Sequence, residues 1–260
     1  MSFNKLKDEG ISAVCEAIQS NKETKLASLN IRCNSIGPVG AKSVATMVAV
    51  TGGLTSLNLR DNQLCGLNAI GKGTYTAEGI AAIADALRVN GGLTSLNLSE
   101  NQLCGLDRYG VGTYTAEGIT GIADAMRVNG GLTVTNLLRN QLDAESANLL
   151  AEVAKQKGIS LCGIRRDQTT ADFSYQNLKL PDDAILLASD LSQAVVTGGL
   201  TALDLSSNDL KDEGVSAVCK AIQSNKDTKL ASLNFKNNGI SPGGANAVAA
   251  MVAVTGVLTV

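Results

Sequence analysis

The sequence predicts an α/β repeat solenoid, in which short parallel strands alternate with helices along one continuous core. An eleven-residue pattern, LTSLNLRDNQL at 54–64, returns in related form at 26–36, 93–103, 132–142, 200–210 and 230–240. Segments with apolar residues at helical spacing lie between these copies. A unit of this kind buries its apolar face only by stacking on its neighbours, so the core grows lengthwise.

Each residue type in the pattern has a physical role. In the copy at 54–64, Leu57 and Leu59 alternate as the inward side chains of a strand, while the residues between them face solvent. Leu54 and Leu64 extend the same core. Asn62 lies where the strand turns away, and its side chain can bond backbone groups that would otherwise be unpaired.

These copies resemble the leucine-rich repeat, whose signature is L-x-x-L-x-L-x-x-N-x-L. The basic unit of about 28–30 residues, with a helix in each, resembles the ribonuclease-inhibitor type of this repeat. That resemblance implies a horseshoe with parallel strands on the concave face and helices on the convex face. We expect residues 1–260 to form a single domain, with about seven full repeats and partial repeats at both ends.

The first expected helix lies within 6–21, where Ile11, Val14, Cys15 and Ile18 form an apolar stripe. The next helix opens after Gly37–Pro38, because proline is tolerated at the first position of a helix.

Two neighbouring units carry an extra stretch between the asparagine turn and the helix. It reads CGLNAIGKGTY at 65–75 and CGLDRYGVGTY at 104–114. We expect these two loops to lie side by side on one rim, beyond the carboxyl ends of the strands. Thr76 and Thr115 follow them and are the expected N-caps of the next helices.

The pattern then weakens. The segment 161–178 is expected to start a strand at Leu161 but to delay its turn, with Gln176 at the asparagine position and Leu178 resuming the repeat. A helix is expected over 181–196.

Residues 210–258 repeat residues 6–54, and the last residues begin another strand. Repeat arrays usually finish with a polar capping unit, and neither end shows one. We therefore expect either a segment of a longer array, or self-association through ends that include an edge carrying Leu258 and Val260.

Composition narrows the chemistry. The sequence has no histidine, so a Ser–His–Asp or Cys–His arrangement is impossible. The net charge of −2 argues against a nucleic-acid partner. We expect no enzymatic activity, no cofactor and no metal.

The six cysteines lack zinc-ligand spacing and are expected to be buried thiols, with a disulfide between Cys65 and Cys104 as the alternative.

Residues 66–74, GLNAIGKGT, come near a phosphate-binding loop. That chemistry needs Ser or Thr directly after Lys72, where this sequence has Gly73, and the second loop has Val111 in place of the lysine. Loop glycines are the favoured interpretation. The chain also lacks an apolar signal segment and any run long enough to cross a bilayer, so we expect a cytoplasmic, intracellular protein without a membrane partner.

Protein interfaces are anchored by Trp, Tyr and Arg. The central column of the expected concave face reads Asn30, Asn58, Asn97, Asn136, Arg165, Asp204 and Asn234, a ladder more typical of structure than of binding. Thr135 replaces an inward leucine, while Val134 and Leu138 occupy outward-facing positions. The candidate partner-binding residues are Arg60, Tyr75, Arg108, Tyr109, Tyr114, Leu138, Arg139 and Arg165. Alternatively, the tyrosines pack one loop on the other, and the outward Leu138 reflects a local register error.

The leading interpretation is a non-enzymatic protein–protein interaction module or scaffold that uses the concave face and the loops 65–75 and 104–114. Ribonuclease inhibitors and the sensing domains of NOD-like receptors, which the repeats resemble, bind macromolecules. The alternative is a GTPase regulator resembling Ran GTPase-activating protein, acting through Arg108, Arg165 or Arg166. A recently expanded repeat without a conserved ligand is a third alternative.

Overall fold

A computed structural model describes residues 1–21 and 23–255. Leu258 and Val260, on which the predicted edge pairing depends, lie outside the described residues. The chain divides into two compact units, Met1–Leu142 and Asp143–Val260. A single domain over 1–260 stays a prediction, as does the horseshoe shape.

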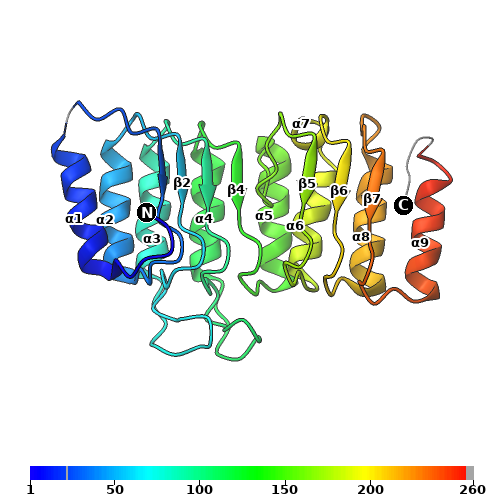
Figure 1. Ribbon diagram of the computed structural model, residues 1–260, viewed down its shortest axis with the longest axis horizontal. Helices are drawn as coiled ribbons and strands as arrows, with labels where there is room; N and C mark the ends of the chain where they lie inside the picture. The colour runs from blue at the N-terminus through cyan, green and yellow to red at the C-terminus, as the bar shows by residue number, and fades with distance from the viewer. Residues whose placement is uncertain (22, 256–260) are drawn as a thin grey trace. The chain divides into compact units, whose positions relative to one another are not determined.

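In the first unit, four parallel strands lie in the order β1-β2-β3-β4, and the helices cover one side of the sheet (Figure 1). Leu29, Leu57, Leu96 and Thr135 are paired in register along it. The elements are α1 (Lys7–Ser20), β1 (Ser28–Asn30), α2 (Pro38–Val50), β2 (Ser56–Asn58), α3 (Glu78–Val89), β3 (Ser95–Asn97), α4 (Glu117–Val128) and β4 (Val134–Asn136).

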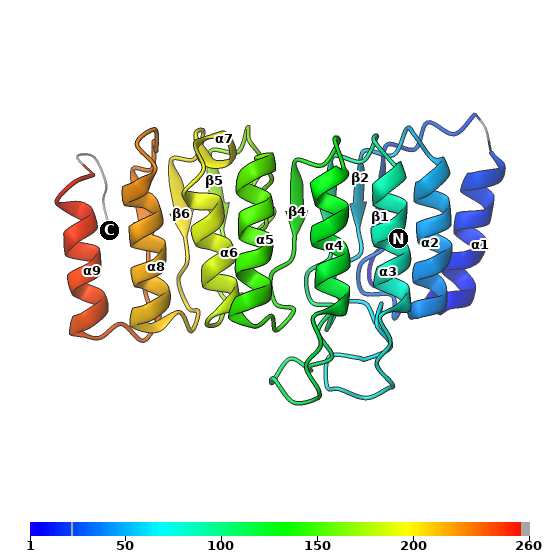
Figure 2. The same ribbon diagram turned by 180° about the vertical axis from the view of Figure 1, so that it is seen from behind.

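The second unit repeats this plan with three parallel strands in the order β5-β6-β7 (Figure 2). Its elements are α5 (Ala144–Lys157), β5 (Thr170–Asp172), α6 (Asp182–Leu191), α7 (Ala194–Thr197), β6 (Ala202–Asp204), α8 (Lys211–Ser224), β7 (Ser232–Asn234) and α9 (Pro242–Val252). The predicted α/β repeat solenoid with parallel strands is confirmed. None of the helices in the described residues has the length and apolar character needed to cross a bilayer.

The turn asparagines hold consecutive repeats together. Asn62 is buried, and its Nδ2 donates to the carbonyl oxygens of Leu59 (2.9 Å) in its own repeat and Ile31 (3.2 Å) in the preceding one. Its Oδ1 accepts from the N–H groups of Asn34 (3.0 Å) and Ile36 (3.1 Å). Buried backbone groups need such partners, so the predicted role of this residue is confirmed.

The strand predicted at Leu161 is wrong. Leu161 lies in a turn that is held by the buried carboxylate of Asp190, and the strand is β5. Asp190 accepts from Ser160 Oγ (2.6 Å) and from the N–H groups of Leu161 (2.7 Å) and Cys162 (3.0 Å).

The end of this repeat follows the prediction. Gln176 Nε2 donates to the carbonyl oxygen of Asp172 (3.1 Å), and the N–H of Leu178 donates to Asn208 Oδ1 (2.9 Å). The helix expected over 181–196 is divided into α6 and α7.

Two local predictions need adjustment. Helices α3 and α4 begin two residues after Thr76 and Thr115, so neither threonine is the N-cap residue. Their hydroxyl oxygens nevertheless accept from the N–H groups of Glu78 and Glu117, both at 3.3 Å. The first turn of each helix therefore still gains a partner for one backbone donor.

All six cysteines lie in the described residues and are thiols outside disulfides, so the alternative of a Cys65–Cys104 disulfide is wrong. Five are buried, and Cys33 is partly exposed. Burial raises the pKa of Cys15 and of Cys65 to about 12. Such thiols are inert packing groups at neutral pH.

Candidate protein-interaction surface

Each inserted loop closes on itself. In the loop 65–75, the N–H of Thr76 donates to the carbonyl oxygen of Cys65 (3.0 Å), and Leu67 and Gly73 form an antiparallel bridge. In the loop 104–114, Thr115 donates to Cys104 (3.0 Å), and Leu106 and Gly112 form the matching bridge. Both loops are therefore folded structures in their own right.

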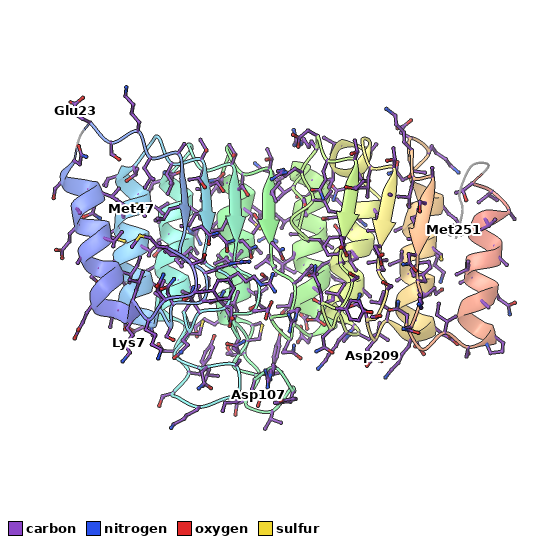
Figure 3. The ribbon with its side chains drawn as sticks, viewed as in Figure 1. Lys7, Glu23, Met47, Asp107, Asp209 and Met251 are labelled. Atoms are coloured by element: carbon purple, nitrogen blue, oxygen red, sulfur yellow. The ribbon has the colours of Figure 1, made fainter. Side chains whose placement is uncertain are left out.

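A single polar side chain organises the tip of each loop. Asn68 Oδ1 accepts from the N–H groups of Ile70 (3.1 Å) and Lys72 (2.9 Å). Asp107, labelled in Figure 3, occupies the same position in the second loop and accepts from Tyr109 (2.8 Å) and Val111 (2.9 Å). An Asn or Asp side chain often shapes a turn in this way.

These bonds also bear on whether the glycine-rich stretch 66–74 is a phosphate-binding loop. The N–H groups of Ile70, Gly71 and Lys72 donate within the loop, to the side chain or backbone of Asn68. A phosphate cradle needs backbone N–H groups that point at the ligand. The interpretation as structural loop glycines is therefore supported. In residues 1–21 and 23–255, no group of three or more Cys, Asp or Glu side chains is placed to hold a metal ion.

Glycine is required where the two arms of each loop approach. Gly73 has φ +132°, and a Cβ added there would lie 2.0 Å from the carbonyl oxygen of Gly66. Gly112 has φ +141°, and a Cβ added there would lie 2.3 Å from the carbonyl oxygen of Gly105. L-residues with side chains rarely adopt such φ values, so these glycines fix the backbone path of the loops.

The two loops lie side by side, as predicted, and project past the strand ends of the first unit (Figures 1 and 2). The N–H of Arg108 donates to the carbonyl oxygen of Ala69 (3.2 Å). Tyr75 Oη donates to the carbonyl oxygen of Leu103 (3.0 Å), and burial raises the pKa of Tyr75 well above its ordinary value. Tyr75 therefore packs one repeat on the next, which is the structural alternative stated for the tyrosines.

The outer ends of the loops are apolar and exposed. Ile70, Tyr109 and Val111, which we call the apolar tip, are 60%, 65% and 68% exposed. The guanidinium of Arg108 lies 4.9 Å from the centre of the Tyr109 ring, and its Nη2 donates to Tyr109 Oη (2.7 Å). Tyr114 is partly buried. These three exposed apolar side chains lie on two loops whose backbones are hydrogen-bonded to each other, unlike the isolated exposed apolar residues common on protein surfaces.

Two cavities flank the loop 65–75. One, of about 440 Å³, is lined by both loops, including Leu67, Tyr75 and Val111. The other, of about 370 Å³, lies toward the preceding repeat and is lined by residues that include Cys33, Asp61 and Ile70. Val111 thus lines the first cavity and Ile70 lines the second, and both residues also belong to the apolar tip.

Two of the predicted arginines form an ion-pair cluster. Glu100 lies 2.6 Å from Arg60 Nη2 and 2.8 Å from Arg139 Nη1, so the cluster crosses three repeats. The carboxylate is mostly buried and both guanidinium groups are at least partly so. Their charges are directed at one another, which favours a structural role for this part of the strand face.

The predicted polar column is in register within each sheet, but most of its side-chain hydrogen bonds lie within one repeat. Asn30, Asn58, Asn97, Asn136, Asp172, Asp204 and Asn234 each accept, through Oδ1, the N–H of the residue two positions later. A bond between repeats is present from Asn234 Nδ2 to Asp204 Oδ2 (3.0 Å). Asp172 occupies the position predicted for Arg165 because the strand begins later than expected.

Two candidate residues do not join the loop surface. Leu138 was expected to face solvent but is only 1% exposed, so its side chain offers no docking area. Arg165 lies outside the strands, with its Nε 3.8 Å from the carboxylate of Asp167. The GTPase-regulating role proposed for Arg108, Arg165 or Arg166 stays a prediction.

The tyrosines and Arg108 were predicted from the sequence as candidate partner-binding residues, whereas Ile70 and Val111 were not. Both are β-branched apolar residues next to glycines in an inserted loop. Apolar side chains in a closed loop with so little core of its own have few places to be buried. That local composition could have identified them.

Comparison with known proteins agrees with this architecture. The repeated strand, asparagine turn and helix define an α/β solenoid-type repeat protein. A family model described as Leucine Rich repeat matches residues 22–45 and 200–219, which supports the leucine-rich repeat pattern predicted from the sequence. The ribonuclease-inhibitor subtype stays a prediction. No curated protein sequence matches the chain significantly.

Two solved structures are similar in part. One, titled Leiomodin-1 Actin-Binding Site 2, has 21% sequence identity and a TM-score of 0.43, covering 60% of this chain and 80% of the other. The other is a tropomodulin C-terminal domain from Caenorhabditis elegans, with 10% identity, a TM-score of 0.29, and coverage of 94% and 91%. At these scores the likenesses do not bear on what this chain binds.

Proposed function

We propose that this chain is a protein-interaction module whose partner docks on the paired loops 65–75 and 104–114. The observation that carries the proposal is the apolar tip, three exposed apolar side chains on two loops whose backbones are hydrogen-bonded internally and to each other. The neighbouring strand face supplies a polar rim. Interfaces commonly combine an apolar centre with such a rim.

Preorganisation supports this assignment. A loop that is ordered before binding loses less conformational entropy when a partner docks. Here the closing bonds of both loops, the bonds to Asn68 and Asp107, and the contact from Arg108 to Ala69 are all formed in the free chain. Tyr109 offers an aromatic anchor, and Arg108 is held against its ring. Tyr and Arg are enriched among the residues that dominate binding energy.

The cavity between the loops indicates the kind of contact to expect. Its wall includes the apolar side chains of Leu67 and Val111 and the ring of Tyr75, with Glu117 as a charged group. A cavity of about 440 Å³ is large enough for one aliphatic or aromatic side chain of a partner. We therefore expect the partner to insert an apolar residue there.

Site-specific photo-crosslinking tests the proposal. A photoreactive residue at Tyr109 should capture the partner from a source-cell extract, whereas the same residue at Asn148, exposed on α5, should not. Equal capture from both positions would contradict the proposal.

The captured protein, once purified, allows a direct measurement of affinity. Val111→Asp should weaken binding at least about tenfold, because it places a charge in the apolar tip. The matched change Val128→Asp, at the exposed end of α4, should leave affinity unchanged. A Val111→Asp variant that binds like the unmodified chain would exclude the loops as the docking surface.

A further inference from the structure

Arg32 and Arg60 are neighbours on the strand face of the first unit. Strands β1 and β2 pair in register at Asn30 and Asn58 (Figure 2), and beyond them the N–H of Cys33 donates to the carbonyl oxygen of Arg60 (3.0 Å). The two arginines therefore occupy equivalent positions in consecutive repeats, on strands that lie about 4.8 Å apart. The strand, turn and helix of both repeats are described in full.

The following repeats show how an acidic residue is held on this face. Glu100 belongs to the repeat after that of Arg60 and lies directly before the turn asparagine, Asn101. Its carboxylate lies 2.6 Å from Arg60 Nη2 and 2.8 Å from Arg139 Nη1, so two guanidinium groups share one acid. A glutamate at this position thus reaches the arginine of the preceding repeat.

Asp61 has the position relative to Arg32 that Glu100 has relative to Arg60, but it does not pair with Arg32. It precedes the turn asparagine Asn62, and its φ of +53° is close to the +59° of Glu100. Its side chain is one methylene shorter, and its Oδ2 accepts from Cys33 Sγ (3.2 Å). Arg32 forms no ion pair with any residue that the structure describes.

An aromatic ring holds Arg32 in place. The guanidinium carbon lies 4.6 Å from the centre of the Phe3 ring, and Nε is buried without a hydrogen-bond partner among the described residues. Stacking on a ring orients a guanidinium but leaves its N–H groups free to donate. Because like charges on neighbouring strands repel, the adjacent Arg60 adds to the need for an anion. Arg32 therefore lacks the acid that Glu100 supplies to Arg60.

The amides beside the arginines indicate what kind of molecule carries that anion. Asn30 and Asn58 each use Oδ1 to accept the N–H two residues later, at 3.3 and 3.0 Å. Neither Nδ2 donates a hydrogen bond within the described part of the chain. An amide donor and a guanidinium thus lie side by side in both repeats. An extended peptide can accept from such amides with its backbone carbonyl groups while it presents a carboxylate to the arginines.

We propose that Arg32 and Arg60 bind a carboxylate of an acidic protein segment, with Asn30 and Asn58 as donors to its backbone. The bound carboxylate pairs with Arg32 as Glu100 pairs with Arg60. This site lies on the strand face and needs no contact with the apolar tip. It is therefore independent of the docking proposed for the loops, and a peptide probe tests it without that partner.

NMR titration of the unmodified chain at low salt tests the proposal. The probe is a tetraglutamate peptide with blocked ends, and the arginine Nε–Hε signals report binding at each guanidinium. The signals of Arg32 and Arg60 should shift with the peptide, and added salt should reduce the shifts because it screens exposed charges. A blocked tetraglutamine peptide should move neither signal. Equal shifts at Arg88 on α3 and Arg127 on α4 would show non-specific attraction and overturn the proposal.

Inorganic phosphate distinguishes a protein segment from a phosphate group as the source of the anion. The peptide engages the amides as well as the arginines, so it should shift the Arg32 signal at lower concentration than phosphate does. Phosphate that acts at the lower concentration would overturn the assignment to an acidic protein segment.

Substitutions of Asp61 give a sharper test. Asp61→Glu adds the missing methylene, and Glu100 shows that the backbone at this position accepts a glutamate. The new carboxylate should pair with Arg32, shift the Arg32 signal without peptide and weaken peptide binding about fivefold. Asp61→Asn carries no charge that could compete, so it should bind the peptide at least as tightly as the unmodified chain. Unchanged affinity in Asp61→Glu, or weaker binding in Asp61→Asn, would overturn the proposal.

Substitutions of single arginines complete the design. Arg32→Gln should lower the affinity for the glutamate peptide about fivefold, whereas Arg88→Gln on α3 should leave it unchanged. Both variants should keep the backbone amide spectrum of the folded chain, since Arg32 makes no side-chain hydrogen bond to a described residue. A folded Arg32→Gln variant that binds the peptide like the unmodified chain would exclude this site.

Discussion

The side-chain amide of Asn101 donates a hydrogen bond to the backbone carbonyl oxygen of Leu59, one repeat earlier, over 3.0 Å. The same Nδ2 lies 3.0 Å from the carbonyl oxygen of Leu98 in its own repeat, and Oδ1 accepts the N–H of Asn62 at 3.2 Å. One buried side chain therefore pairs backbone groups of two consecutive turns.

Replacing this residue should be costly. Asn101→Ala leaves buried backbone groups without partners, and we expect it to lower the free energy of unfolding by about 2–4 kcal/mol. Urea denaturation measures this, with Asn148→Ala on the exposed face of α5 as the matched control. Equal small effects from both variants would show that the turn asparagines contribute little.

Gly73→Ala should disturb the loop 65–75 without reaching the core. The added Cβ would meet the carbonyl oxygen of Gly66 at 2.0 Å, and φ of +132° is unfavourable for alanine. We expect the free energy of unfolding to fall by about 1–3 kcal/mol. Amide exchange should become faster only in the paired loops. Gly91→Ala, which meets nothing within 4 Å, is the control and should change neither measurement.

The stability of the second unit should depend on pH through Asp190. Burial raises the pKa of this carboxyl group from 3.8 to about 6, against the opposing effect of its hydrogen-bond donors. Because the folded pKa is the higher one, the stabilisation is complete below the unfolded pKa and is lost as pH rises through about 6. We expect the free energy of unfolding to lose about 2 kcal/mol from this source between pH 4 and 7.

Asp190→Asn isolates the contribution of that group. The difference in free energy of unfolding between the unmodified chain and this variant should shrink as pH rises over the same interval. Asp167→Asn, which changes an exposed carboxylate between α5 and β5, should follow the unmodified profile throughout. A difference that does not vary with pH would contradict a protonated Asp190 in the folded chain at pH 4.

The cysteines should differ in reactivity. Cys33 is partly exposed, while the other five are buried, so a thiol reagent should modify Cys33 first in the folded chain. Burial and the hydrogen bond to Asp61 raise the pKa of Cys33 to about 11, which keeps this reaction slow at pH 8.

Asp61→Asn removes a negative charge and a charged acceptor beside the thiol. The pKa of Cys33 should fall and its reaction should become faster, as followed by absorbance or intact mass. Asp85→Asn, which lies on α3, should leave the rate unchanged. Faster modification of a buried cysteine than of Cys33 would mean that the repeats open more readily than the structure implies.

Much of the fold could be predicted because the leucines that recur in the sequence pattern are the residues that become buried in the structure. Leu57, Leu59 and Asn62 take the places their pattern indicates. The strand β5 was misplaced because Ala171 and Phe173 stand where leucines are usual, while Leu161 imitates the start of a repeat. The true environment of Leu161 depends on the hydrogen bond from its N–H to Asp190, about thirty residues away. No local pattern in the sequence reveals that bond.

The candidate site was only partly predictable. Composition identified the inserted loops and the residues Tyr109 and Arg108, since both the duplication and the residue types are visible in the sequence. The exposure of Ile70 and Val111 depends on backbone turns set by Asn68 and Asp107. The pairing of Arg60 with Glu100 depends on the register between repeats.

Hydrogen exchange of the chain with and without its crosslinked and purified partner measures whether the paired loops are the docking surface. We expect peptides covering 65–75 and 104–114 to gain protection on binding, and this gain to be lost in Val111→Asp. Protection confined to other segments, with both loops exchanging as in the free chain, would contradict it.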